Sequence, residues 1–333
     1  MSGKGMSTIG SLGIIGGGAW GTALALTASR AGRQAILWAR DAAIVEAINL
    51  RAENPRYLPG SRLSPSIAAT AELGEALSAD AVLLAVPAQQ VGALARQLAP
   101  LIRPAQPILI AAKGIDRESG KRLSEVLIDA IPQARTAVLS GPSFASDVAN
   151  GLPTAVTIAA LDEALALELC RALAGPAFRP YAETDVIGVE LGGALKNVLA
   201  IAAGAVIGRG LGASAAAAII ARGFAEQRRF AQAQGARPET LMGLSGLGDL
   251  VLTCSNRQSR NYSFGIALGE GRPAATGILV EGAATAAIVV EIAEKLALEM
   301  PVCQAVADVL ARRLSIGEAM EDLMTRPLKR ETI

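Results

Sequence analysis

One motif constrains the fold of this chain more than any other feature. The apolar run at residues 12–16, LGIIG, leads into residues 16–21, GGGAWG, which have the spacing G-x-G-x-x-G. A helical pattern and a second apolar run at residues 35–38 follow, completing a strand–helix–strand unit. In such a unit the glycines allow a pyrophosphate to approach the helix N-terminus closely, although a glycine-rich turn without a ligand is the alternative. The motif predicts a dinucleotide site on its three glycines: Gly16, Gly18 and Gly21.

The alternation of apolar runs with helical segments continues through the first half of the chain. Continuously apolar strands separated by amphipathic helices are typical of a parallel sheet that is covered on both faces. After about Asp185 the apolar runs largely disappear, and long Ala/Leu/Gly-rich helical patterns replace them. We therefore expect an α/β Rossmann-type domain with a mostly parallel sheet in residues 1–185, followed by an all-α domain in residues 186–333. The further runs predicted as strands are residues 81–87, 107–113, 136–142 and 153–159.

Charge and residue usage exclude several classes of function. Lys+Arg total 31 against 30 for Asp+Glu, so no global charge attracts nucleic acid or an anionic membrane. The chain has no histidine, which removes Ser-His-Asp triads and histidine metal sites. Three widely spaced cysteines form neither a disulfide framework nor a zinc motif. We expect a protein without a metal and without a nucleic-acid partner.

The apolar segments also bear on location. The charge-free runs, such as residues 197–208, are shorter than the roughly 20 apolar residues that span a membrane, so we expect no stable membrane insertion. The first ten residues, MSGKGMSTIG, lack the long apolar region of a signal peptide. We therefore expect a cytoplasmic location. The sequence does not fix the number of subunits, and a homodimer is one assembly that it allows.

The end of the second strand bears on the choice of nicotinamide cofactor. An NAD-selective site usually carries Asp or Glu there to bind the ribose diol, whereas this chain has Arg40 followed by Asp41. Arginine pairs with a 2′-phosphate, so we expect NADP(H) to be preferred and NAD(H) to be possible. The alternative is that Arg40 is a solvated loop residue and Asp41 is the N-cap of the next helix.

Two later strand ends carry candidate ligand contacts. Lys113 closes the run PILIAAK, and residues 141–145, GPSFA, form a loop of small residues after the next run. Doubly wound sheets place ligands at the carboxyl ends of their strands. Val86-Pro87 ends another strand, where it either lies over the nicotinamide or serves as ordinary helix punctuation.

Lys196 lies inside the apolar run LGGALKNVLA of the second half. On a helix its neighbours three and four residues earlier are Gly193 and Gly192, which leave one face nearly bare. We expect a substrate between the two domains to fill that space, with Lys196 exchanging a proton beside the carbon that exchanges hydride. Asp249, in the segment GLSGLGD, would pair with this lysine; a purely structural lysine–carboxylate pair is the alternative.

A third group of polar residues opens a helix near residue 260. Ser259, Arg260 and Asn261 would bring a guanidinium, short polar side chains and free backbone N–H groups to one helix N-terminus. That combination suits a phosphate group. An ordinary serine N-cap beside a surface arginine is the alternative.

Five motifs together resemble a known family. GGGAWGTALA, the AAKG and SGPSFA loops, DVIGVELGGALKNVLAIAAG and GLGDLVLTCSNRQSRN look like those of the bacterial-type NAD(P)-dependent glycerol-3-phosphate dehydrogenases. The resemblance implies a cytoplasmic oxidoreductase that interconverts dihydroxyacetone phosphate and sn-glycerol 3-phosphate for glycerophospholipid synthesis. It implies Lys196 as proton acceptor, held by Asp249. It also implies these substrate contacts: Lys113, Gly141, Ser143, Lys196, Asp249, Ser259, Arg260 and Asn261. The implied nucleotide contacts are Ala19, Trp20, Arg40, Lys113, Ala145, Arg260, Leu279 and Glu281.

Two other functions fit the same motifs. Another hydroxyacid or ketoacid dehydrogenase of this architecture would share the glycine motif and a lysine in the helical domain, but it need not require a phosphate. A non-catalytic NADP-binding sensor would bind the nucleotide without turnover. Competition by inorganic phosphate separates the first from the family reaction, and turnover itself separates the second.

Overall fold

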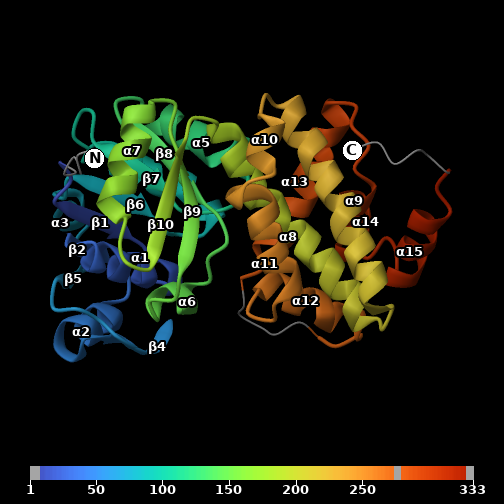
Figure 1. The fold of residues 1–333 in the computed structure, drawn as a ribbon, viewed down its shortest axis with the longest axis horizontal. Coiled ribbons are helices and arrows are strands. Elements are labelled where there is room, and N and C mark those ends of the chain that lie inside the picture. Colours follow the sequence, from blue (N-terminus) through green and yellow to red (C-terminus); the bar gives the residue numbers. More distant parts are fainter. Residues whose placement is uncertain (1–7, 274–278, 328–333) are drawn as a thin grey trace.

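The N-terminal part of the chain is built on one sheet of eight strands (Figure 1). In this computed structural model, residues 8–273 and 279–327 are described. The strand order is β10-β9-β8-β7-β6-β1-β2-β5, and neighbours are parallel except for the antiparallel pair β8–β9. The predicted Rossmann-type, mostly parallel sheet is therefore confirmed. The strands are β1 Ser11–Ile15, β2 Gln34–Trp38, β5 Ile67–Thr70, β6 Ala81–Leu84, β7 Pro107–Ile110, β8 Arg135–Ser140, β9 Thr154–Ala159 and β10 Phe178–Glu183.

Helices cover both faces of this sheet. Along β1, Leu12 and Ile14 belong to a core with α1, α2 and α7, whereas Ile15 belongs to a core with α3, α4 and α5. Successive strand side chains point to opposite faces, so apolar residues at every position give a sheet buried on both sides. The elements of this part are α1 Ala19–Arg30, α2 Ala42–Arg51, α3 Leu73–Leu77, η1 Ala88–Gln90, α4 Val91–Leu98, α5 Leu123–Ala130, α6 Ala145–Ala149 and α7 Glu163–Leu173, with a small hairpin of β3 Glu53–Asn54 and β4 Leu58–Arg62.

Two strands of the eight-stranded sheet are not predicted by the apolar pattern, and both lie at the edges of the sheet. β5 and β10 stand at the two ends of the strand order. β10, FRPYAE, contains Pro180, and several of its side chains are exposed. An edge strand tolerates proline and exposed side chains, so β10 lacks the continuous apolar run of an inner strand, whereas β5 is missed because its apolar run is only three residues long.

From α8 onward, the described residues form helices only, as the sequence predicts. Asp185 is the N-cap of α8, where its side chain accepts a hydrogen bond from the Gly188 N–H at 2.8 Å. The division at residue 185 remains a prediction about domains. The helices are α8 Val186–Gly208, α9 Gly212–Ala233, α10 Pro238–Leu241, η2 Leu244–Gly248, α11 Asp249–Ser255, α12 Arg260–Gly269, α13 Glu281–Lys295, α14 Pro301–Leu310 and α15 Ile316–Met324.

Helix α8 is the core of the helical part. It packs against α9, α11, α12 and α13 and also contacts β8 of the sheet. Its length and apolar composition would suffice for a membrane span, but 83% of its apolar window is buried within the protein. Glycines let it approach α12 backbone to backbone, because a Cβ on Gly204 would lie 2.1 Å from the Tyr262 carbonyl oxygen. This close packing holds Lys196, near the middle of α8, in a fixed position.

Candidate active site

The glycine motif forms a tight loop with open space above it. Gly16 has φ +129°, and a Cβ there would lie 2.5 Å from the Ala85 carbonyl oxygen. A Cβ on Gly21 would lie 1.8 Å from the Gly16 carbonyl oxygen, so only glycine fits both positions. A Cβ on Gly18 would meet nothing within 4 Å. The space above Gly18, at the N-terminus of the 12-residue helix α1, fits the pyrophosphate of a nicotinamide dinucleotide.

The other predicted nucleotide residues of the first half lie around this loop. Ala19 is the first residue of α1, and Trp20 donates its indole N–H to the Ala111 carbonyl oxygen at 3.2 Å. Arg40 follows β2 and is exposed. Asp41 is the N-cap of α2, as the alternative interpretation has it. The cap leaves Arg40 free to act at the nucleotide, so its role remains a prediction.

Lys113, Lys196 and Asp249 come together from three different elements. Lys196 on α8 places its Nζ 2.5 Å from Asp249 Oδ1 and 3.0 Å from Thr253 Oγ1. Lys113, after β7, places its Nζ 2.7 Å from Asp249 Oδ2 and donates to the Gly141 carbonyl oxygen at 2.9 Å. The predicted pair of Lys196 with Asp249 is confirmed as a contact. The same carboxylate also binds the sheet-domain lysine.

Burial controls the charge states of this cluster. The Asp249 side chain is 1% exposed, and those of Lys113 and Lys196 are 13% and 10% exposed. Burial, together with the nearby charge of Lys113, lowers the pKa of Lys196 to about 8 against the opposing effect of the Asp249 charge. A lysine with this pKa exists in both protonation states near neutral pH, as a group that gives and takes a proton requires.

The bare helix face beside Lys196 is filled by protein, and the expectation that substrate fills it is wrong. A Cβ on Gly192 would lie 2.6 Å from the Ser245 carbonyl oxygen of η2. A Cβ on Gly193 would lie 2.4 Å from Ser140 Oγ and 3.3 Å from the Lys113 side chain. The two glycines therefore let α8 enter between η2 and the end of β8. That close approach brings Lys196 to Asp249.

The loop after β8 lies beside Lys113. Gly141 has φ +138°, and a Cβ there would lie 2.9 Å from the backbone of Val156. Its carbonyl oxygen also accepts a hydrogen bond from Ser143 Oγ at 3.0 Å. Ala145 begins α6 just beyond. The predicted residues Gly141 and Ser143 are thus joined to the lysine cluster.

The predicted phosphate site is a helix start with structural bonds of its own. Ser259 is the N-cap of α12, and its Oγ accepts from the Tyr262 N–H at 3.2 Å, as the alternative interpretation has it. Asn261 donates to Asn197 Oδ1 at 2.9 Å and accepts from the Gly282 N–H at 2.9 Å. Arg260, the first residue of α12, is exposed. The direct phosphate contacts of these residues remain a prediction.

Glu281 reaches from the helical part to the sheet part. It begins α13, and its carboxylate lies 3.4 Å from the Ala88 N–H, directly after Val86-Pro87. Burial raises the pKa of Glu281, while the charge of Arg260 lowers it. Pro87 is the N-cap of η1, in line with the interpretation that this proline marks the start of a helix. Leu279 is 42% exposed, and its nucleotide contact remains a prediction.

Two polar residues of the cluster were missed by sequence reasoning. Thr253 follows Asp249 by four residues on α11 and therefore shares its helix face, a spacing that would have found it. Asn197 adjoins Lys196 in sequence and joins α8 to Asn261. Its only sequence signal is a polar residue in an apolar helix.

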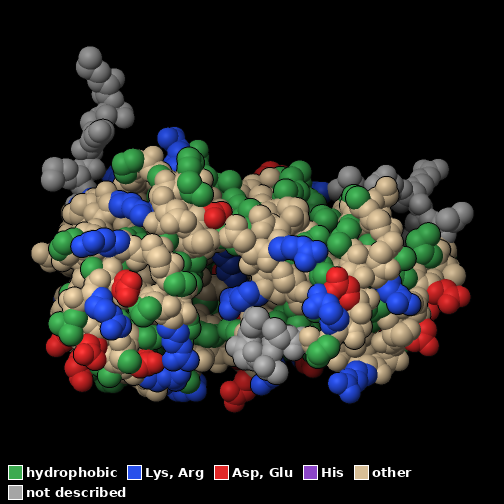
Figure 2. Space-filling model, turned by 90° about the horizontal axis from the view of Figure 1, so that it is seen from below, with side chains coloured by type: hydrophobic (Ala, Val, Ile, Leu, Met, Phe, Trp, Pro, Cys, Tyr) green, Lys and Arg blue, Asp and Glu red, His purple; other side chains and the backbone are tan. Residues whose placement is uncertain are grey.

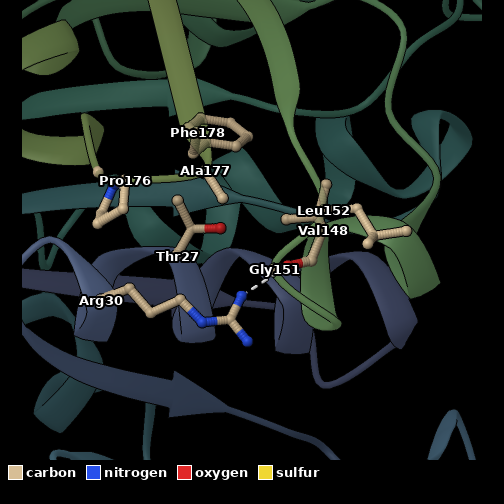
Figure 3. A pocket seen from close by; sticks show the side chains of 9 residues that line it. Thr27, Arg30, Val148, Gly151, Leu152, Pro176, Ala177 and Phe178 are labelled. Atoms are coloured by element: carbon tan, nitrogen blue, oxygen red, sulfur yellow. Dashed lines mark hydrogen bonds between the residues drawn. The ribbon is translucent and has the colours of Figure 1, made fainter.

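Two surface cavities of about 330 Å³ each are lined by residues outside the lysine cluster. One is lined by residues of α1, α6 and the start of β10, where Arg30 donates to the Val148 carbonyl oxygen at 2.7 Å (Figure 3). The other lies between β9–β10 and η2. Figure 2 instead shows a hollow between the sheet and helical parts with Lys and Arg side chains at its edge. Within the described residues, no group of three or more Cys, Asp and Glu is placed to hold a metal ion.

The chain matches known proteins over nearly its whole length. Residues 11–166 match the family described as NAD-dependent glycerol-3-phosphate dehydrogenase N-terminus, and residues 185–321 match its C-terminus. The chain is 56% identical to glycerol-3-phosphate dehydrogenase [NAD(P)+] of Bradyrhizobium sp. (strain BTAi1), over 98% of this chain and 100% of that protein. It is 54% identical to the enzyme of that name from Brucella canis, over 96% and 98%.

Solved structures agree. The crystal structure of glycerol-3-phosphate dehydrogenase from Coxiella burnetii superposes with a TM-score of 0.91 at 38% identity, over 96% of this chain and 99% of that one. A ketopantoate reductase from Ralstonia eutropha, at 19% identity and a TM-score of 0.60 over 93% and 99%, shares the fold alone. The likeness in sequence and structure thus extends across both the glycine loop and the lysine cluster. This chain belongs to the NAD-dependent glycerol-3-phosphate dehydrogenase family.

Proposed function

We propose that this protein catalyses the reversible, NAD(P)H-dependent reduction of dihydroxyacetone phosphate to sn-glycerol 3-phosphate. One observation carries the proposal. A buried lysine, Lys196, lies at the meeting of the sheet and helical parts with its Nζ held by Asp249 and Thr253. The proteins that share this chain's sequence at 53% to 56% identity are named for this enzyme and for either nicotinamide.

Lys196 performs the proton transfer of this reaction. When bound, the reduced nicotinamide supplies a hydride to C2 of the ketone. The Lys196 ammonium donates a hydrogen bond to the carbonyl oxygen and then transfers its proton to the forming alkoxide. In the reverse direction neutral Lys196 accepts the proton of the C2 hydroxyl. Its lowered pKa, about 8, makes both states accessible.

Asp249 and Lys113 set the position and charge of Lys196. Asp249 accepts from both lysines with separate oxygens, so it fixes their spacing without itself serving as the base. Lys113 adds a second positive charge beside the reacting carbonyl, which stabilises the developing negative charge. The Gly141 carbonyl oxygen orients the Lys113 ammonium.

The start of α12 receives the phosphate of the substrate. Arg260 carries the guanidinium there, and the first turn of the 10-residue helix presents N–H groups to an anion. Holding the phosphate away from the reacting carbon orients C2 toward the cofactor and Lys196. Ser259 and Asn261 fix the shape of this site through their own hydrogen bonds.

The setting of the reaction completes the proposal. Its product supplies glycerophospholipid synthesis in the cytoplasm, and the active unit is a monomer or a homodimer. NADPH is the preferred reductant because Arg40, which follows β2 and Ala39, pairs with the 2′-phosphate that NADH lacks.

Initial rates test the reaction and its two rivals together. We expect saturable oxidation of NADPH by dihydroxyacetone phosphate, competitive inhibition by inorganic phosphate, and little turnover of ketopantoate. Turnover of unphosphorylated ketoacids that inorganic phosphate does not inhibit would favour another hydroxyacid or ketoacid dehydrogenase. Nucleotide binding without turnover of any of these substrates would favour the sensor.

A further inference from the structure

The small hairpin β3–β4 is anchored to the glycine loop. Asn54, at the end of β3, is fully buried and donates to the Gly17 carbonyl oxygen and to Thr22 Oγ1, each at 2.9 Å. This anchor holds the turn that follows, with Arg56 and Tyr57, at the end of the sheet where β2 finishes. The hairpin therefore lies beside the glycine loop and the residues that follow β2.

Asp41, at the position where an NAD-selective site binds the ribose diol, has both carboxylate oxygens in use. Oδ1 accepts from the Ala43 N–H at 3.0 Å as the N-cap of α2. Oδ2 accepts from Arg56 Nη1 at 3.0 Å. Each oxygen keeps a further lone pair, but the Arg56 guanidinium neutralises the charge that would attract two ribose hydroxyls and competes with them for Oδ2.

Arg56 also has donors to spare. Its guanidinium lies over the Tyr57 ring, 5.2 Å from the ring centre, and its side chain is 63% exposed. Within the described residues Asp41 is its one carboxylate partner, and Arg40 has none. Arg40 directly precedes Asp41 in the chain and Arg56 pairs with it, so two arginines are associated with this one carboxylate. An arginine fork matches the oxygens of a phosphate better than any other side chain.

We propose that Arg56 is a specificity-determining residue that favours NADP(H) over NAD(H). It does so by pairing with Asp41, which weakens that carboxylate as an acceptor for a ribose diol, and by adding a second guanidinium to Arg40 for the 2′-phosphate. This inference rests on the proposed use of a nicotinamide nucleotide but not on the identity of the reduced substrate.

Binding of two nucleotide fragments tests this role without any turnover. Calorimetric titration of the full-length protein with 2′,5′-ADP and with 5′-AMP, at one fixed low salt concentration, gives a ratio of dissociation constants. We expect the wild-type protein to bind 2′,5′-ADP more tightly, and Arg56→Ala to reduce that preference by about tenfold. Arg56→Lys keeps the charge but loses the fork, and we expect it to recover only part of the preference.

Arg62→Ala is the matched control, because Arg62 is an exposed arginine at the end of the same hairpin and the variant loses the same charge. We expect its preference to stay within about twofold of wild type, since distant exposed charges are screened. A second comparison uses Arg56→Ala alone and Arg56→Ala combined with Asp41→Asn. The Asp41→Asn substitution keeps a side-chain oxygen that accepts the N-cap hydrogen bond of α2. Asp41→Asn should weaken 5′-AMP binding in the Arg56→Ala background only.

Three outcomes would overturn the inference. They are equal binding of the two fragments by wild type, an unchanged preference in Arg56→Ala, or equal losses in Arg56→Ala and Arg62→Ala. Failure of the proposed reaction is a separate result, since it appears as absent turnover of dihydroxyacetone phosphate in protein that still distinguishes the two fragments.

Discussion

At the scale of single residues, one carboxylate shared by two lysines sets the chemistry of the site. Asp249 is the most deeply buried of the three charged groups, with its side chain 1% exposed. An isolated buried carboxylate would be strongly disfavoured, and two ammonium partners remove that cost. In return the two lysines repel each other, which contributes to the lowered pKa of Lys196 after the larger effect of burial. The cluster carries a net positive charge toward an anionic substrate.

The pKa of Lys196 predicts opposite pH dependence in the two directions. Reduction needs the ammonium form, so its rate falls as pH rises through about 8; oxidation needs the neutral form, so its rate rises over the same range. Profiles of kcat for both directions, with saturating cofactor, check this. If kcat changed with pH in the same direction for both reactions, or showed no inflection between about pH 7 and 9, Lys196 would not be the proton carrier.

At the scale of elements, the site depends on how closely α8 can approach its neighbours. Gly192 faces the backbone of η2, the short π-helix that leads directly into Asp249. A π-helical turn inside a helical segment often occurs at functional sites. Here it directs Asp249 toward both lysines.

Elsewhere in the helical part, Glu226 of α9 accepts hydrogen bonds from the N–H groups of Val302 and Cys303 and so fixes the start of α14.

Gly192→Ala should therefore disturb catalysis without disturbing the cofactor loop. The new Cβ would lie 2.6 Å from the Ser245 carbonyl oxygen, so η2 must shift and carry Asp249 with it. We expect kcat to fall by at least about tenfold, because displacements near 1 Å at a catalytic group have such effects. The dissociation constant of NADPH, measured by fluorescence titration, should stay unchanged.

Gly74→Ala serves as the control for Gly192→Ala. Gly74 is also helical, in α3, but its Cβ would meet nothing within 4 Å. Equal kcat values in the two variants would show that the close approach of α8 to η2 has no part in catalysis.

At the scale of the whole molecule, the sequence predicted what local patterns encode and missed what depends on tertiary contacts. Inner strands carry apolar runs and were found, whereas the edge strand β10 is broken by Pro180 and charged residues, and the apolar run of the edge strand β5 is only three residues long. The pairing of Lys196 with Asp249 was expected, but Lys113 as the second partner of Asp249 was not, because no sequence spacing relates residues 136 positions apart. The space beside Gly192 was assigned to substrate because a glycine pattern shows missing bulk and not what fills it.

The proton-transfer site forms where the two halves of the chain meet. Lys113 and Gly141 come from the sheet part, and Lys196, Asp249 and Thr253 come from the helical part. Neither part alone contains the complete proton-transfer site. The cofactor loop at Gly16, by contrast, lies wholly in the sheet part. Binding at the glycine loop and proton transfer at Lys196 are therefore separable by substitution.

The most direct test is the rate of a single turnover in Lys196→Met, a variant that keeps the length of the side chain but carries no proton. Enzyme with bound NADPH is mixed with dihydroxyacetone phosphate, and NADPH absorbance is followed. We expect a rate lower by about 10² to 10⁴-fold, with NADPH affinity unchanged. Lys121→Met, at a half-exposed lysine paired with Asp129, should retain the wild-type rate. A Lys196→Met rate within a few-fold of that control would contradict Lys196 as the proton donor.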